Sequence, residues 1–526
     1  MTALEAVALA TILGAVLTAG LRWMRVAQRE HYLSGSVTRF ALRWWASSSL
    51  NLALGAVGVI AAVLTFVWPA VAFAVALVLL VSPVGLGLRG RTSKLRWTRR
   101  LRTLAAGAAT LAALVVALSG TFAGLSGAVR AGALLALLVP VLVDVALLAL
   151  APLEDGLAER HVIEARTKLA RVRPRVVAVT GSFGKTTTKG YIAHFVGDRL
   201  NTLASPASFN NRPGLARTVN EHLGPGTEVF VAEMGTYGRG EIRALCSWIV
   251  PEISVITAIG PAHLERFRSL DRTLEAKSEI AERARVVVLN VDDERLSGLA
   301  ERLEREGKQV VRASGADPHA DVAVIAGGGA LELHVAGRLV GAAPVATGEQ
   351  PPALSNAACA AAVAIELGTP PGEIPARLAG LPSPPNRLQR HLAEGGYVVL
   401  DDTFNSNPAG ARMAIRRLGT EAPEGRRVLV TPGMVELGRT QAEENARLAA
   451  EASALVTDLV AVARTNRRAL VEGAERSSPG TGGGAGQSGA EVHVVDVLPQ
   501  AVEWVRRHLG PGDAVLYEND LPDHFP

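Results

Sequence analysis

The sequence is poor in cysteine and in aromatic residues, and both shortages exclude classes of protein. Its 526 residues include two cysteines, and aromatic residues make up 4% of the chain. Cys246 and Cys359 lie far apart in the sequence, so they can form neither a disulfide framework nor a zinc cluster, which suits a cytosolic environment. The net charge of +5 is modest, and no basic stretch is interleaved with aromatic residues. We therefore expect no nucleic-acid partner.

Long stretches before residue 152 lack charge and are strongly apolar. Residues 46–88 contain no charged side chain at all. The apolar blocks are residues 3–20, 46–88, 104–124 and 131–152. A membrane span needs about 20 apolar residues, so these blocks predict about five transmembrane helices, two of them joined by a turn at Trp68-Pro69. The first block could also be a signal peptide, but Glu5 stands where a basic segment is expected, and further spans follow.

The arginine and lysine residues between these blocks predict the orientation of the helices. They are concentrated at 22–43 and 89–102, whereas the other connections hold little basic charge beyond Arg130. Basic connections stay on the cytoplasmic side, which places the N-terminus outside and all residues after 152 in the cytosol. Asp144 lies inside the last predicted span. An intramembrane carboxylate is a candidate functional group, but it can also satisfy a neighbouring helix, and the sequence leaves both readings open.

The stretch VVAVTGSFGKTTT at 176–188 predicts a nucleotide site. A run of β-branched residues ends in a glycine-rich turn, and the residues that follow suit a helix. In such a turn the backbone N–H groups face a phosphate, Lys185 reaches the terminal phosphates, and the Thr186 hydroxyl holds Mg²⁺. Val179 stands where the general phosphate-binding motif has its first glycine, so the match is partial. The alternative is a glycine-rich turn with an unrelated lysine.

Short apolar segments that alternate with helical ones predict a doubly wound sheet after residue 174. We expect its strands at 176–180, 229–232, 253–257 and 286–290. Residues 321–347 suit a few antiparallel strands, and helices are expected near 354–367 and 372–380. A second series of strands is expected at 397–400, 428–430, 459–462, 492–495 and 514–517.

Shifts in composition divide the chain into segments. The proline-rich stretch LPSPPNR at 381–387 predicts a domain boundary. Residues 477–490 form a low-complexity loop to which we assign no chemistry. We expect a membrane region at 1–155, a charged linker helix at 156–173, a nucleotide-binding domain at 174–385 and a further α/β domain at 386–526.

Several ordered motifs after residue 174 resemble those of the Mur ligase family. They are most similar to its MurF branch, which adds D-alanyl-D-alanine to a peptidoglycan precursor. The motifs are TGSFGKTTTK, SFNNRPG, VAEMG, HLERF, EAKSEI, LNVDDE, SNAACAAA, DDTFNSNP and GMVELG. The short glycine loop, which misses the general spacing, is the form found in this family. The resemblance implies α/β domains, namely a P-loop Mur-ligase central domain and a Rossmann-like C-terminal domain. They would follow the α-helical membrane region that the apolar blocks predict.

The resemblance also implies a reaction. A ligase of this kind transfers the γ-phosphate of ATP to a substrate carboxylate, and an amine then displaces phosphate from the acyl phosphate to leave an amide. Positive charge must be concentrated between these anionic reactants. By the resemblance, Lys185, Lys277 and His263 are catalytic. A pair of Mg²⁺ ions would be held by Thr186, Glu233, His263 and a carbamylated Lys277, because a carbamate offers the oxygen ligands that Mg²⁺ prefers.

The remaining site residues are also carried over from the family. Those expected around the phosphates of ATP are Gly181, Ser182, Gly184, Lys185, Thr186 and Thr187. Those expected at the rest of the nucleotide are Asn356 at the adenine, Arg387 at a phosphate and Asp402 at the ribose. Those expected at the substrates are Asn210, Asn211, Asn405 and Asn407. Taken alone, Asn356, Asn405 and Asn407 could instead cap turns, and Lys277 could be a solvated helix lysine.

The chain departs from the MurF branch at both ends. Predicted membrane helices take the place of the soluble domain that binds the UDP-sugar. The C-terminus reads YENDLPDHFP, where the branch has a lysine-containing KGS-type segment. We therefore expect a multi-pass protein of the cell membrane whose catalytic domains lie on the cytoplasmic side. Its partners would be a small amino substrate and a carboxylate acceptor, which the membrane region could receive on a lipid.

Other functions share some of these features. A membrane-bound ligase of poly-γ-glutamate type belongs to the same superfamily, but DDTFNSNP and GMVELG favour the MurF branch. A non-catalytic nucleotide-dependent scaffold conflicts with the intact set Lys185, Thr186, Glu233, His263 and Lys277. An ATP-driven transporter would also combine a phosphate loop with membrane spans, but the ligase-like C-terminal domain and the single nucleotide site oppose it.

Overall fold

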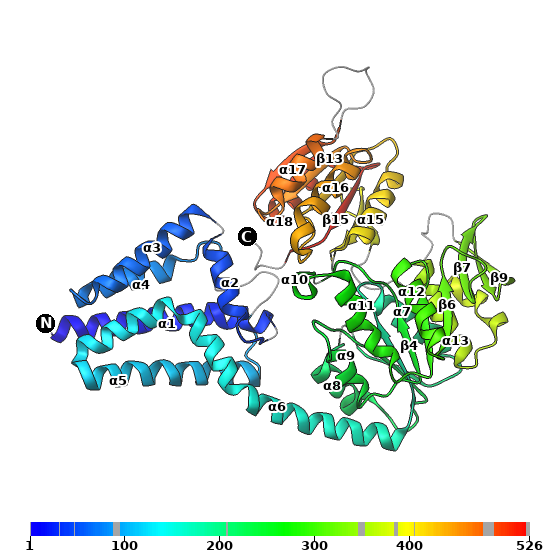
Figure 1. The fold of residues 1–526 in the computed structure, drawn as a ribbon. Helices are drawn as coiled ribbons and strands as arrows, with labels where there is room; N and C mark the ends of the chain where they lie inside the picture. Colours follow the sequence, from blue (N-terminus) through cyan, green and yellow to red (C-terminus); the bar gives the residue numbers. More distant parts are fainter. Residues whose placement is uncertain are drawn as a thin grey trace. The chain divides into compact units, whose positions relative to one another are not determined.

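The structure is a computed structural model that describes residues 2–30, 32–46, 48–87, 95–206, 209–262, 264–345, 353–382, 388–403, 406–476 and 489–521. It contains two units. The first is formed mainly by residues 1–157, and the second by residues 158–462 and 466–520. The first unit has one large hydrophobic core, whereas the second has separate cores on its two sheets. Figure 1 draws the chain, with labels on most helices and on some of the strands.

The first unit is helical (Figure 1). Its elements are α1 (Thr2–Arg29), α2 (Ser36–Trp45), α3 (Ser49–Leu64), the short 3₁₀ helix η1 (Pro69–Val71), α4 (Ala72–Val81), α5 (Arg99–Leu137) and the first part of α6 (Val139–Val172). Trp68 directly precedes η1, so the turn predicted there is confirmed. α5 is interrupted at Ala123 and Gly124, whose backbone angles are not helical, close to the expected end of the block 104–124.

Two of the described helices, at residues 3–29 and 99–137, are long and apolar enough to cross a membrane. The bent pair α2 and α3 could form a third span. α4 has 10 residues, about half of the roughly 20 that a span needs. Large apolar side chains are exposed on this unit, including Val67 at 84% and Phe122 at 89%. Five spans therefore stay a prediction.

Asp144 of α6 is buried and binds the N-terminus of α2. Its carboxylate accepts the backbone N–H groups of Val37 (3.3 Å) and Thr38 (2.8 Å) and the Thr38 hydroxyl (2.5 Å). Gly35, which precedes α2, has no side chain that could cap these groups. Asp144 is therefore a helix cap supplied by a neighbouring helix, which is the second of the two readings that the sequence left open.

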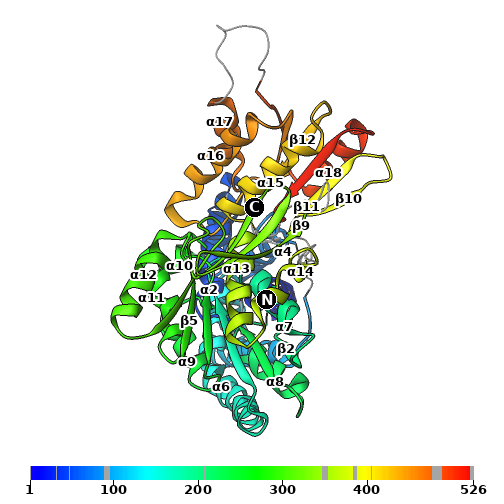
Figure 2. The same cartoon turned by 90° about the vertical axis from the view of Figure 1, so that its right-hand side faces the viewer.

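The second unit begins within α6, and its first sheet has nine strands. Some of these strands are labelled in Figure 2. In spatial order the nine strands are β2 (Thr202–Ala204), β3 (Val229–Glu233), β1 (Arg175–Thr180), β4 (Ile253–Ile256), β5 (Val286–Asn290), β6 (Gln309–Ser314), β7 (Val322–Gly327), β8 (Ala330–Val335) and β9 (Arg338–Pro344). β2 to β7 are parallel, whereas β8 and β9 add antiparallel strands. The strand order reverses beside β1, and ligands bind at such reversals, beyond the carboxyl ends of the strands.

Helices cover both faces of this sheet, so β3 and β5 are buried along their whole length. The helical elements are α7 (Lys185–Val196), α8 (Arg212–His222), α9 (Glu241–Cys246), α10 (Leu264–Phe267), α11 (Leu270–Ser278), η2 (Glu279–Ala281), α12 (Glu294–Arg305), α13 (Leu354–Glu366), η3 (Pro371–Glu373) and α14 (Pro375–Leu378). α7 and α13 share the core on one face, and α8, α9 and α12 share the core on the other with the end of α6. The buried alanines of α13 let this helix approach the sheet closely.

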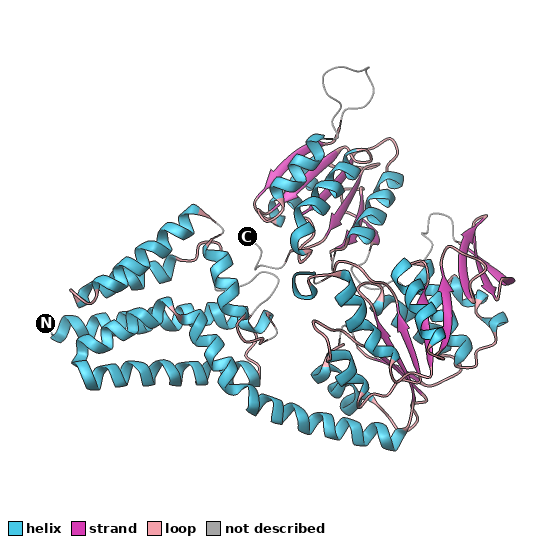
Figure 3. Cartoon of the chain, viewed as in Figure 1, coloured by secondary structure: helices cyan, strands magenta, loops and turns pink. Residues whose placement is uncertain are grey.

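The second sheet has six strands. Figure 3 draws all strands in magenta and the helices in cyan. In spatial order the six strands are β10 (Gln389–Leu392), β11 (Val398–Asp402), β15 (Ala514–Glu518), β12 (Arg427–Thr431), β13 (Asp458–Val462) and β14 (Glu491–Val495). Only β10 is antiparallel among them. The helical elements are α15 (Pro408–Glu421), η4 (Gly438–Thr440), α16 (Gln441–Ser453), α17 (Arg467–Arg476) and α18 (Leu498–His508).

The expected strands of both series are present within a residue or two of their predicted bounds. The expected antiparallel strands are β7, β8 and β9, and the helix expected at 354–367 is α13. β2, β6 and β10 lie outside the predicted strands. The charged linker expected at 156–173 is the continuation of α6, which runs without a break to Val172.

Candidate active site

A glycine-rich turn joins β1 to α7 at the reversal point of the first sheet. α7 begins at Lys185, directly after Gly184, whose φ of 79° lies in the left-handed region that favours glycine. A Cβ at Gly184 would also lie 2.5 Å from Oδ1 of Asn356 on α13. Glycine is therefore needed here for backbone conformation and for space, and Asn356 lies directly against the predicted phosphate loop.

The same turn is bonded to the loop that follows β4. The Ser182 hydroxyl donates to the Gly260 carbonyl (3.1 Å) and accepts from the Gly260 N–H (3.0 Å). The Ser182 N–H donates to the Ala258 carbonyl (2.8 Å), and the Thr257 hydroxyl donates to the Phe183 carbonyl. These bonds fix the turn from its outer side, so Ser182 has a structural role in addition to its predicted place at a phosphate.

Lys185, Thr186 and Thr187 form the first turn of α7. Lys185 Nζ folds back and donates to the carbonyls of Gly181 (2.7 Å) and Ser182 (3.3 Å). α7 has 12 residues, and the backbone N–H groups of its first turn favour an anion. The residues predicted around the phosphates are thus gathered at one helix N-terminus.

The carboxylate of Glu233, at the end of β3, is the centre of a buried polar cluster. Oε2 accepts from the Thr186 hydroxyl (3.0 Å) and from Lys189 Nζ (2.9 Å), and Oε1 accepts from Asn210 Nδ2 (3.1 Å). Burial alone would raise the pKa of Glu233, but the ammonium groups of Lys189 and Lys185 hold it below its ordinary value. Glu233 is therefore ionised, and its carboxylate is held in place by three donors.

Lys189 also belongs to this cluster, and the sequence motifs alone predict no role for it. It stands at the end of TGSFGKTTTK, three residues after Thr186 on the same helix. Its side chain is 6% exposed and forms an ion pair with Glu233. Residues three or four apart share a helix face, so Lys189 lies on the same face as Lys185 and Thr186. This spacing was the signal in the sequence that could have placed Lys189 in the cluster.

Lys277 is buried and lies under the same turn. Its Nζ donates to the Gly181 carbonyl (3.1 Å), which also accepts from Lys185. Burial, together with the positive charge of Lys185, holds the pKa of Lys277 well below its ordinary value. Lys277 is therefore not a solvated helix lysine, which was the simpler interpretation of this residue.

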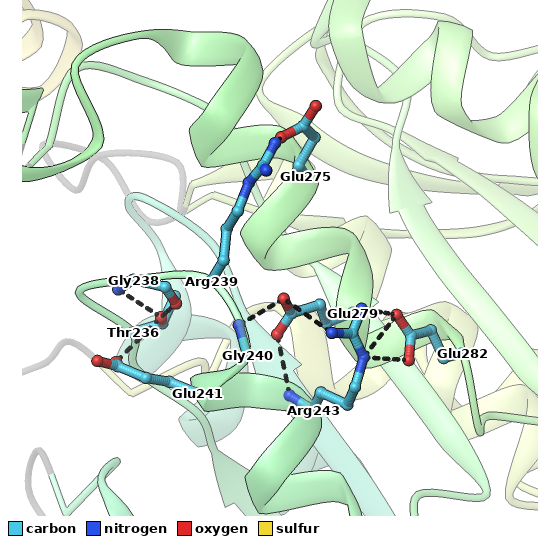
Figure 4. Close-up of polar contacts among 9 residues, drawn as sticks. All are labelled: Thr236, Gly238, Arg239, Gly240, Glu241, Arg243, Glu275, Glu279 and Glu282. Carbon is cyan, nitrogen blue, oxygen red and sulfur yellow. Dashed lines mark hydrogen bonds and ion pairs between the residues drawn. The ribbon is translucent and has the colours of Figure 1, made fainter.

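A network of carboxylates anchors the segment that carries Lys277 (Figure 4). Glu279 is buried, and it accepts from the backbone N–H groups of Gly240 (2.7 Å) and Arg243 (3.0 Å) at the start of α9. Arg243 also binds Glu282 through two of its nitrogens. The loop after Glu233 is thereby tied to the helix of Lys277, which explains how two predicted residues far apart in sequence are held near one turn.

Two of the asparagines predicted at substrates cap helices. Asn211 Oδ1 accepts from the Gly214 N–H (3.0 Å) at the start of α8. Asn407 Oδ1 accepts from the Gly410 N–H (2.9 Å) at the start of α15. Their substrate roles stay predictions, while Asn210 belongs to the Glu233 cluster.

The second sheet holds a further buried carboxyl beside the predicted ribose ligand. Asp402 ends β11, and its Oδ1 accepts from the Leu388 N–H (3.2 Å). Glu518 ends the neighbouring strand β15 and accepts from the hydroxyls of Thr431 (2.7 Å) and Ser406. Burial raises the pKa of Glu518 to about 7; the two hydroxyls oppose this shift, and the charge of Asp402 adds to it.

Three predicted site residues, His263, Arg387 and Asn405, lie outside the described residues. Among the described ones, the donor set fits ATP and Mg²⁺. A helix N-terminus and a lysine meet at the turn, and the hydroxyl of Thr186 and the carboxylate of Glu233 are the hard oxygen ligands that Mg²⁺ takes.

Models of protein families match both α/β parts of the chain. The Mur ligase middle domain matches residues 179–364, and the Mur ligase glutamate ligase domain matches residues 386–517. The UDP-N-acetylmuramoyl-tripeptide–D-alanyl-D-alanine ligase of Mycobacterium tuberculosis is 31% identical over 364 residues, which are 65% of this chain and 69% of that protein. The ligase of the same name from Bacillus subtilis is 29% identical over 280 residues, 52% of this chain and 59% of that protein.

Solved structures share this fold. The MurF ligase of Thermotoga maritima in complex with ADP has a TM-score of 0.58 at 22% identity, covering 69% of this chain and 80% of that chain. A MurF structure from Acinetobacter baumannii has a TM-score of 0.55 at 25% identity, covering 69% of this chain and 77% of that chain. The chain belongs to the Mur ligase family, and it is an ATP-dependent carbon–nitrogen ligase of the MurF type.

Proposed function

We propose that this chain joins an amino substrate to the carboxylate of a cell-wall precursor through an acyl phosphate. The observation that carries the proposal is the meeting of Lys185, Thr186, Glu233 and Lys277 around one turn at the end of β1. The names of the relatives supply the substrate class, a muramoyl peptide and D-alanyl-D-alanine. The second α/β domain, with Asp402 and Asn407, would bind the amino substrate and part of the nucleotide.

The residues of the turn have distinct roles in this proposal. Lys185 would turn from the Gly181 carbonyl to the terminal phosphates, where negative charge develops during phosphoryl transfer. Mg²⁺ held by Thr186 and Glu233 would neutralise charge on the phosphate oxygens. Asn210 keeps the Glu233 carboxylate in place from its other oxygen. Asn356 lies against Gly184, where it would face the nucleotide.

Carbamylation of Lys277 forms part of the proposal. Its amine is buried beside a second lysine, so the neutral form is favoured. The lone pair of a neutral amine can attack CO₂, and loss of one N–H proton leaves a carbamate anion. The anion would be balanced by Lys185 and would add oxygen ligands to a metal site. His263 is retained as the predicted ligand of the second Mg²⁺.

The helical unit suggests where the carboxylate substrate comes from. Apolar helices occupy the part of the chain that precedes the matched family domains. We infer that they hold the enzyme in the cell membrane, with the catalytic domains in the cytoplasm, and that the acceptor is bound to a polyprenyl lipid. Full-length protein in detergent should release ADP and phosphate with lipid-linked muramoyl peptide plus D-alanyl-D-alanine. Equal or better turnover with the soluble UDP-linked peptide would contradict the lipid assignment.

The orientation of the helices can be tested with single cysteines. Both native cysteines are buried, and burial raises the pKa of Cys246 to about 12 and that of Cys359 further, so neither thiol should react. In intact cells, a membrane-impermeant maleimide should label Ala3→Cys, in an exposed position at the start of α1. Glu306→Cys, in an exposed position after α12, should be labelled only after lysis. Labelling of both in intact cells, or of neither, would contradict the proposed topology.

A further inference from the structure

Lys189 and Glu233 form an ion pair that the proposed reaction does not use. Nζ of Lys189 lies 2.9 Å from Oε2 of Glu233, and their side chains are 6% and 1% exposed. Lys189 lies one helical turn after Lys185, whose positive charge also acts on Glu233. The proposed metal ligand therefore already has a cation as its partner.

The hydrogen bonds of Glu233 show what a metal ion would have to displace. Oε2 accepts from both Thr186 and Lys189, and Oε1 accepts from Asn210. A carboxylate oxygen has about two lone pairs, so Oε2 is filled by these donors. Thr186 and Asn210 are neutral and are compatible with a nearby divalent cation. Lys189 is the donor whose charge opposes it.

We propose that Lys189 is a positioning residue that acts as the resident counter-ion of Glu233 and makes metal binding there depend on bound nucleotide. The inference rests on the proposed role of Glu233 as a magnesium ligand. Without nucleotide, a divalent cation would approach a buried carboxylate already paired with an ammonium, with a further lysine nearby. A bound triphosphate adds several negative charges at the N-terminus of α7, so the net charge around Glu233 then attracts a divalent cation instead of repelling it.

This arrangement has two consequences for the cycle of the enzyme. Lys189 holds the Glu233 carboxylate in one orientation while the site is empty, so an ionised group is not left unpaired in the interior. The metal then enters together with ATP and not before it. An ammonium released from Oε2 remains close enough to contribute positive charge to the phosphate site.

The test measures metal binding directly. Mn²⁺ binding to full-length protein in detergent would be followed by the electron paramagnetic resonance of free Mn²⁺, with and without a non-hydrolysable ATP analogue. Lys189→Met should bind Mn²⁺ about tenfold more tightly than the wild type when nucleotide is absent, because the competing charge is gone. The ratio of the Mn²⁺ affinity with nucleotide to that without nucleotide should therefore be smaller in Lys189→Met than in the wild type. Lys189→Arg, which keeps the charge, should restore the wild-type ratio.

Matched variants separate charge from structure. Lys189→Gln keeps a hydrogen-bond donor but loses the charge, and its Mn²⁺ binding should resemble that of Lys189→Met. If the Met variant does not fold, the Gln variant still tests the proposal. Lys308→Met removes a lysine that donates to the carbonyls of Glu282 and Ala284 outside the site, and it should leave Mn²⁺ binding unchanged.

The outcomes distinguish this inference from the proposed function. Unchanged or weaker nucleotide-free Mn²⁺ binding in both uncharged variants would overturn the role of Lys189, because a purely structural residue would weaken the site when removed. Wild-type protein that binds no Mn²⁺ even with nucleotide would instead contradict the metal role of Glu233, and the inference would fall with it.

Discussion

The side-chain nitrogen of Lys277 and that of Lys185 donate to the same carbonyl oxygen, that of Gly181, over 3.1 and 2.7 Å. The two lysines come from segments on opposite sides of β3 and β4 in the sequence. Two ammonium groups on one carbonyl repel each other in a buried site, so one of them favours its neutral form. Lys277, which is buried, is that group, because its pKa is lowered first by burial and then by the charge of Lys185.

A neutral Lys277 amine should be modified by CO₂, and the modification should be needed for activity. Lys277→Ala should lower kcat by about a hundredfold or more, the usual cost of removing a group that stabilises charge in a transition state. Short carboxylates such as acetate or propionate should restore part of the activity by filling the vacated space. Intact mass spectrometry of the wild type at high bicarbonate should show the addition of one CO₂. Undiminished activity of Lys277→Ala would refute the carbamate role.

Local patterns were sufficient to predict the strands and the phosphate turn, whereas the partners of buried charges were not predictable. β1, the turn and α7 are adjacent in sequence, so spacing and residue type specify them together. The pairing of Lys189 with Glu233 depends on β3 lying beside β1, which only the folded sheet establishes. β2, β6 and β10 are short or carry polar and charged residues, so their apolar signal is weak.

Side chains with two plausible roles also limited the prediction. Asn211 and Asn407 occur in family-like motifs, yet their oxygens cap α8 and α15, and a sequence cannot separate a cap from a ligand when both need the same atom. The lengths of the apolar blocks likewise did not predict the shortness of α4, because a run of apolar residues does not specify where its helix breaks.

Gly260 should tolerate no side chain. A Cβ at this position would lie 2.3 Å from Cε2 of Phe183, which belongs to the phosphate turn. Gly260→Ala should therefore displace Phe183 and the Ser182 bonds, raise the KM for ATP about tenfold, and destabilise the fold by about 1–3 kcal/mol, as overpacking does. Gly298→Ala is a matched control in α12 with nothing within 4 Å, and it should be neutral or slightly stabilising. Equal KM values for both variants would contradict the packing argument.

Asp144 should matter for stability and not for catalysis. Replacing it by alanine removes the acceptor for Val37 and Thr38 at the start of α2, and should lower the stability of the helical unit by about 1–2 kcal/mol. Thermal unfolding of full-length protein in detergent would measure this loss. Thr38→Val, which loses only the hydroxyl bond, should cost less, and the double variant should show coupling. An Asp144→Asn variant that is stable but inactive would favour the functional reading of this carboxylate.

Glu518 should make the stability of the C-terminal domain depend on pH in the direction opposite to that of a salt-bridged acid. Its folded pKa of about 7 lies above the ordinary value of 4.5, so the folded state binds more protons than the unfolded state between these two values. Stability is therefore fully present below about pH 4.5 and falls by about 3 kcal/mol as the pH rises through 7. Hydrogen exchange of β15 between pH 5 and 8, corrected for intrinsic rates, would measure the decline. Glu518→Gln, which keeps one acceptor oxygen and turns an amide donor toward the other hydroxyl but cannot ionise, should flatten it. An equal decline in that variant would assign the pH dependence to another group.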